Sequence, residues 1–171
     1  MLNLCPKHCQ QINQDQNTSN KTWGRLLSQG ISAHNNRDHK TAQQLFSRAE
    51  ALATLQLDIC QQSPQNNGLW HGFSTVDMLV IASHNLSAAL CAQKRTMDAE
   101  HCLKKLHRLV SQLCVNPLIG RELRIDALAN LDRSLLSLTS VLGSLGLVES
   151  IQRTIENTEV TADVAARQLF H

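Results

Sequence analysis

The sequence predicts an all-α fold, which both its composition and its periodicity indicate. Residues typical of strands and tight turns are few, since the 171 residues include no Tyr, three Phe, seven Gly and three Pro. Apolar residues recur at spacings of three and four, which place them on one helix face. The length suits one domain with one core. We therefore expect a mobile polar tail over residues 1–18 and a single helical domain over residues 19–171.

The first helical hairpin is expected over about residues 19–60. Polar residues 17–20 offer N-caps for its first helix. The turn falls at residues 35–38, where Asp38 can cap the second helix, and this helix is expected to run to about Cys60.

Small residues mark the predicted contact between these two helices. Gly30 lies in the first helix, and Ala42 and Ala49 lie on one face of the second, at positions i and i+7. Phe46 lies on the same face, between the two alanines. We expect the small residues to let the two backbones approach closely, with the Phe46 ring filling the space beside them.

A loop is expected over residues 61–73, because this stretch contains a Pro, two Gly and two adjacent Asn. It also carries Trp70 and Phe73, which are too apolar to be left fully solvated. Two interpretations stay open. The aromatic side chains fold back onto the core, or Trp70 is an exposed anchor for a partner.

The second hairpin is expected over residues 74–115. Ser74 or Thr75 can cap its first helix, with Asp77 in the first turn, where the helix dipole favours an anion. Thr96 is the expected cap of its second helix. This helix repeats the four-then-three spacing of the first hairpin with Ala99, Leu103 and Leu106.

The third hairpin is expected over residues 117–157. Its first helix is predicted over residues 117–142, with Pro117 at the first turn, and it is ended by Gly143 and Gly146. The apolar stripe of this helix consists of Leu118, Ile125, Leu128, Leu131, Leu135, Leu138 and Leu142.

The partner helix of this hairpin is expected from about residue 147 to 155. A separate short helix over residues 161–170 begins at Thr161 and has an amphipathic pattern. We expect it to cap the last hairpin, although its apolar face could also cover a neighbouring protomer.

The residues of the first hairpin resemble the tetratricopeptide repeat, a 34-residue unit of two helices. The resemblance rests on Gly30 in the first helix and on the series Ala42, Phe46 and Ala49 in the second. Leu26 stands where the family has its first-helix aromatic residue. The resemblance implies a right-handed array of about three antiparallel helical hairpins. The chain is also similar in plan to bacterial secretion chaperones with three such units and to small bacterial helical-repeat proteins of unknown function.

The resemblance further implies a concave face, lined by the first helix of each unit, on which a peptide or a partner helix lies. Carried over to this sequence, the lining residues are Leu27, Ile31, His34, Asn35, His84, Asn85, Ala88 and Cys91. This set is mildly polar and contains no Lys or Arg, so a groove that grips carboxylates is disfavoured. We expect a non-enzymatic adaptor, scaffold or chaperone-like module that binds another protein or peptide. Self-association as a homodimer, through the 61–73 loop or the 161–170 helix, is the alternative.

A metal- or thiol-dependent function is a weaker alternative. Cys5, His8 and Cys9 have spacings that zinc could use, but no second ligand pair lies nearby in the sequence, so no metal site is predicted. His101 and Cys102 are adjacent on one helix, in apolar surroundings that keep a thiol inert. We expect neither catalysis nor a cofactor.

Charge and hydropathy limit the remaining classes. The formal net charge of +2 and the scattered Lys and Arg residues argue against nucleic-acid binding. No charge-free apolar segment approaches 20 residues, so no membrane span is predicted. Without a recognisable export signal we expect a cytoplasmic protein with its six cysteines reduced.

Overall fold

The computed structural model describes residues 16–62 and 73–170, and this part of the chain is helical. It contains six helices: α2 (Gln16–Asn35), α3 (His39–Gln62), α4 (Thr75–Ala92), α5 (Thr96–Val115), α6 (Arg121–Ser144) and α7 (Val148–Phe170). The predicted all-α fold is therefore confirmed.

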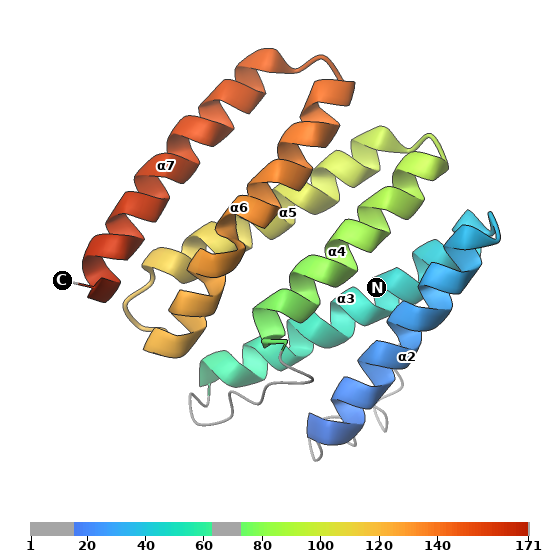
Figure 1. Ribbon diagram of the computed structural model, residues 1–171, viewed down its shortest axis with the longest axis horizontal. Helices are drawn as coiled ribbons and strands as arrows, with labels where there is room; N and C mark the ends of the chain where they lie inside the picture. Colours follow the sequence, from blue (N-terminus) through green and yellow to red (C-terminus); the bar gives the residue numbers. More distant parts are fainter. Residues whose placement is uncertain (1–15, 63–72, 171) are drawn as a thin grey trace.

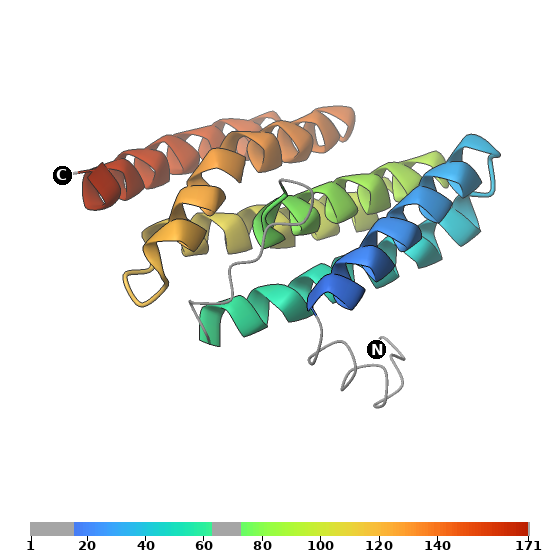
Figure 2. The same cartoon turned by 60° about the horizontal axis from the view of Figure 1, so that its bottom comes forward.

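Each helix packs against the next one along the chain and runs in the opposite direction (Figure 1). Further contacts join α2 to α4, α4 to α6 and α5 to α7. Figure 2 shows the resulting stack, from α2 and α3 at one end to α6 and α7 at the other. Helix α4 lies near the middle and packs against α3, α5 and α6.

The predicted close contact between the first two helices is confirmed. A Cβ atom added to Gly30 would lie 2.5 Å from Cε1 of Phe46, which is closer than any side chain tolerates. Ala42, Ala49 and Phe46 are all buried. The absence of a side chain at Gly30 is what allows the Phe46 ring to lie against the α2 backbone.

The first helix begins earlier than the sequence predicts. Because α2 starts at Gln16, residues 16–18 belong to this helix and not to the predicted tail, whose other residues lie outside the described part of the chain. Ser19 and Asn20 are buried side chains within the helix instead of caps. Their oxygens each lie 2.8 Å from Nε2 of Gln56 on α3, which donates to both. A distant partner thus lets these polar residues lie inside a packed helix.

Of the other predicted helix caps, two are confirmed and one is wrong. Asp38 Oδ1 accepts from the Thr41 backbone N–H at 3.1 Å, and Ser74 forms a capping box with Asp77. Thr96, however, is the first residue of α5. Arg95 occupies the cap position without a capping side chain, and it pairs with the first-turn acid Asp98 at 2.7 Å.

The predicted start of helix α6 is wrong. Helix α6 begins at Arg121, so Pro117 lies in the preceding turn. Asn116 Oδ1 accepts from the Leu118 backbone N–H at 3.0 Å, and this local bond favours a turn over a helix. Leu118 is 91% exposed and does not belong to the apolar stripe.

The end of the chain forms one helix, where the sequence predicts two. Helix α7 runs without a break through the stretch between the predicted segments 147–155 and 161–170. Thr161 therefore lies inside a helix, and its hydroxyl donates to the Asn157 carbonyl at 2.8 Å. Thr158 is buried against α5. This tertiary contact holds a stretch of low helix propensity in the helix.

Several predicted features lie outside the described residues. These are the Cys5, His8 and Cys9 cluster and Trp70, together with most of the 61–73 loop, since α3 continues to Gln62. Among the described helices, only α4 is long and apolar enough to cross a membrane by length and composition, and 61% of it is buried inside the protein. A core helix of a soluble protein passes the same test.

Replacing Gly30 by Ala should lower the free energy of unfolding by about 1–3 kcal/mol, because the new methyl group meets the buried Phe46 ring. Gly143→Ala is the matched control. A Cβ there meets only Ile151 at 3.9 Å, so this variant should gain about 0.5–1 kcal/mol from helix propensity. Urea denaturation of both variants measures the difference. Equal stability of Gly30→Ala and the parent would show that the ring moves freely and that the contact is not a constraint.

Candidate functional site

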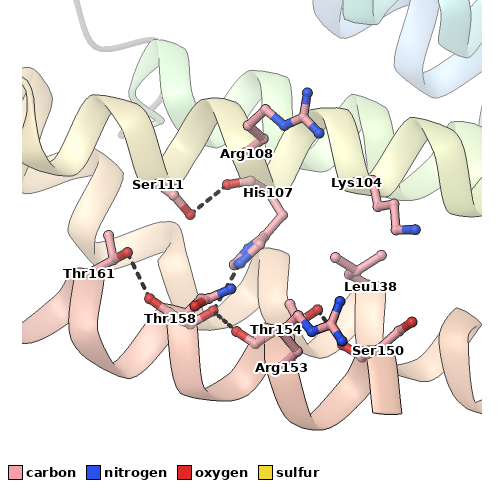
Figure 3. Close-up of a pocket in the computed structure, with 11 residues that line it drawn as sticks. Lys104, His107, Arg108, Ser111, Leu138, Ser150, Arg153, Thr154, Thr158 and Thr161 are labelled. Carbon is pink, nitrogen blue, oxygen red and sulfur yellow. Dashed lines mark hydrogen bonds between the residues drawn. The ribbon is translucent and has the colours of Figure 1, made fainter. Parts of the chain in front are cut away.

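A cavity of about 450 Å³ opens between α5, α6 and α7 (Figure 3). Helix α5 contributes a buried histidine and several polar side chains, α6 one leucine, and α7 a row of polar residues. The lining consists of Lys104, His107, Arg108, Ser111, Leu138, Ser150, Arg153, Thr154, Asn157, Thr158 and Thr161.

His107 links the three helices that surround the cavity. Its Nδ1 lies 2.8 Å from the Ser134 hydroxyl on α6, and its Nε2 lies 3.0 Å from the Thr158 hydroxyl on α7. All three side chains are buried. The imidazole therefore fixes the position of α7 against α5 at the centre of the cavity.

Which groups donate hydrogen bonds in this network depends on the protonation state of His107. The Ser134 hydroxyl also contacts the Leu131 carbonyl at 2.8 Å, and the Thr158 hydroxyl contacts the Thr154 carbonyl at 2.7 Å. Each hydroxyl has one hydrogen, so both can donate to these carbonyls only if both ring nitrogens donate as well. That arrangement needs a charged imidazolium. In the neutral ring, one hydroxyl must turn from its carbonyl to the unprotonated nitrogen.

Burial lowers the pKa of His107, because it disfavours the charged form. The neutral ring is therefore the stable form near neutral pH.

The positive charges at the cavity come from two facing helices. Lys104 forms an ion pair with Glu100, whereas Arg108 and Arg153 make no ion pair with any residue that the structure describes. In Figure 3, Lys104 and Arg153 extend from α5 and α7 toward the space around Leu138, while the Arg108 guanidinium points away from α7. No carboxylate is among the lining residues. The cavity is therefore basic, although the sequence suggests scattered charges.

The residues predicted to line a concave face lie on α2 and α4. On α4, His84, Asn85 and Cys91 are half-buried and Ala88 is exposed. The Asn85 side-chain amide donates to the Ile81 carbonyl of the same helix at 2.8 Å. Burial lowers the pKa of His84, and the Arg133 charge on α6 adds to this effect. His84 is therefore an uncharged side chain at neutral pH.

On α2, Leu27 and His34 are half-buried, whereas Ile31 and Asn35 are exposed. His34 lies against His39 across the turn to α3, with ring centroids 4.9 Å apart. Helices α2 and α4 are in contact, but no hydrogen bond between described residues joins the predicted lining residues of one helix to those of the other. The structure thus places the two sets on neighbouring helices without a shared polar network.

The Cys91, Cys102 and Cys114 thiols are not activated. All three are free cysteines, and burial raises the pKa of Cys91. Burial, with Glu50 nearby, raises the pKa of Cys102 to about 12, and burial raises the pKa of Cys114 to about 11. Within residues 16–62 and 73–170, no group of three or more His, Cys, Asp or Glu side chains could hold a metal ion.

Comparison with known proteins assigns no family to the chain. No family model matches the sequence, and neither a curated protein nor a solved structure matches the chain. The sequence does not predict the cavity, because its pattern divides α7 into two segments. Only a continuous α7 places Ser150, Arg153, Asn157 and Thr161 on one helix face.

His107 should make folding stability depend on pH. The unfolded chain, with an ordinary pKa near 6.5, takes up a proton that the folded protein does not, so the free energy of unfolding should fall as pH drops below 6.5. His107→Gln should make the free energy of unfolding fall less at low pH. The remaining pH dependence should come in part from His84. Urea denaturation of both proteins between about pH 5 and 7.5 measures the difference. Parallel pH profiles would show that His107 keeps its ordinary pKa in the fold.

Proposed function

We propose that the chain is a non-catalytic protein-binding module whose partner lies on the solvent-facing side of α2 and α4. The observation that carries the proposal is the uncharged stripe on α4. Ile81, His84, Asn85 and Ala88 recur at helical spacing and are the partly open side of an otherwise buried helix. A central, well-packed helix that exposes small and uncharged residues offers a rigid surface for a partner segment.

The chemistry of this stripe defines the partner. The one charged residue of α4, Asp77, is already engaged by Asn130 at 3.0 Å and by Arg133 at 3.3 Å. The stripe itself offers apolar contact, the Asn85 amide oxygen and the neutral His84 imidazole. The fitting partner is therefore a helical or extended segment with an uncharged, partly apolar face, not an acidic tail.

This proposal includes a tetratricopeptide-like arrangement, in which α2, α4 and α6 form the inner row of a right-handed array. The contacts of α4 with both α2 and α6 support such a row. The close packing at Gly30 and Phe46 supports the first unit.

Self-association is the second candidate, and exposed apolar side chains favour it. The last two helices expose large apolar side chains: Leu136 on α6 and Val148, Val160 and Phe170 on α7. A second copy of the chain would remove them from water. Light scattering across a range of protein concentrations distinguishes a dimer from a monomer.

A charge placed on the α4 stripe should weaken binding of the partner. The tagged full chain is used to recover co-purifying proteins from its native cells, and each candidate is then purified and titrated calorimetrically. Ala88→Glu should weaken a genuine complex about tenfold or more, because it buries an unpaired carboxylate at the contact. Ala88 is exposed in the free protein, so the variant should fold normally.

Gln112→Glu is the matched control for this test. It adds the same charge at an exposed position of α5, away from the stripe, and should change the affinity by less than about twofold. Equal affinity of both variants for the purified partner would place the contact elsewhere. A concentration-dependent dimer that Ala88→Glu leaves intact, without any partner, would replace the proposal by self-association.

A further inference from the structure

We propose that the cavity between α5, α6 and α7 binds a small phosphate ester of a polyhydroxy compound, such as a sugar phosphate. The site is separate from the α2 and α4 surface, so it does not depend on the function proposed above. Three features carry the inference: the cations at one end, the neutral oxygen acceptors at the other, and a volume suited to a small molecule.

The cationic end lies around Leu138, where Lys104 and Arg153 extend from facing helices (Figure 3). Arg153 has no ion-pair partner among the described residues, and the cavity lining includes no carboxylate. A guanidinium can bind two phosphate oxygens at once, and a nearby ammonium adds a second positive charge. Lys104 also forms an ion pair with Glu100, which precedes it by one turn on α5. This end is therefore complementary to a phosphate group.

The other end of the cavity offers acceptors. In Figure 3, Ser111, Thr158 and Thr161 lie away from Lys104, beyond His107. Ser111 and Thr161 donate their hydroxyl hydrogens to backbone carbonyls of their own helices, both at 2.8 Å. Their oxygens keep free lone pairs, which accept hydrogen bonds and repel an anion. The part of the ligand that lies here must therefore carry O–H or N–H donors and no charge.

The combination selects the ligand class. A free inorganic anion would use the cationic end alone, whereas a phosphate ester with several hydroxyl groups fits both ends. A volume of about 450 Å³ is within the range of small-molecule sites. The cavity lies between three helices that His107 fixes relative to one another, so the two ends keep their separation.

The test uses glucose 6-phosphate, inorganic phosphate and glucose as probes, titrated into the full chain and followed by backbone amide NMR. Glucose 6-phosphate should shift the amides of α5 and α7 in a saturable way and bind at least about tenfold more tightly than inorganic phosphate. Glucose should bind more weakly than either. Absence of any saturable shift with glucose 6-phosphate up to about 10 mM would overturn the proposal.

Two charge variants locate the phosphate. Arg153→Gln should weaken glucose 6-phosphate binding about tenfold or more, because it removes a charged double contact. Arg167→Gln removes the same charge from an exposed position of the same helix, outside the cavity, and should change the affinity by less than about twofold. An equal loss in both variants would mean nonspecific attraction to the net charge and would overturn the site.

Thr161→Val tests the acceptor end. It removes the oxygen while keeping a β-branched shape, so glucose 6-phosphate should bind several-fold more weakly and inorganic phosphate should be unaffected. Equal affinity of the parent and this variant for glucose 6-phosphate would overturn the assignment of the hydroxyl-bearing part. Thermal unfolding of each variant verifies that the fold is retained. A phosphoserine peptide that binds more tightly than glucose 6-phosphate would transfer the site to a protein partner and overturn the small-molecule assignment.

Discussion

The contact between Gly30 and the Phe46 ring is the steric constraint on which the first half of the fold depends. Because a Cβ at Gly30 would lie only 2.5 Å from the ring, α2 and α3 can pack this closely only with a glycine at this position. Helix α3 then presents its other buried residues, among them Leu52, Leu57 and Cys60, to the rest of the core. Helix α4 packs closely against it. The missing side chain at Gly30 thus allows the close packing of α2 on α3, against which α4 lies.

In the second half of the fold, from α4 to α7, polar contacts fix how the helices pack. The Asp77 carboxylate both caps α4 and reaches Asn130 on α6, and His107 joins α5 to α6 and α7. Hydrogen bonds are directional, so these contacts fix the position of each helix along its axis, which apolar packing alone leaves less defined. The cavity lies where this polar packing replaces an apolar core.

The parts of the fold that were predicted correctly depend on nearby residues. The Gly30 contact, the Asp38 cap and the Ser74 capping box each involve residues within about 16 positions of one another. The error at Pro117 has a local cause in the Asn116–Leu118 hydrogen bond, whereas the error at the break before Thr161 depends on a distant contact. Burial of Thr158 against His107, 51 residues away, keeps α7 continuous despite weak helix formers. The cavity could not be predicted because it needs both this continuity and the packing of α7 on α5.

Net charge conceals the difference between the α4 surface and the cavity against α5. The sixteen Lys and Arg residues are nearly balanced by fourteen Asp and Glu, which gives +2 for the chain. Several of them are neutralised by local pairs, such as Arg95 with Asp98 and Arg167 with Asp163. Arg153 has no ion-pair partner among the described residues, and it lies in a cavity whose lining contains no carboxylate. A chain that is nearly neutral can therefore carry an uncharged surface on α4 and a basic cavity against α5, because the ion pairs and not the total charge decide where positive potential remains.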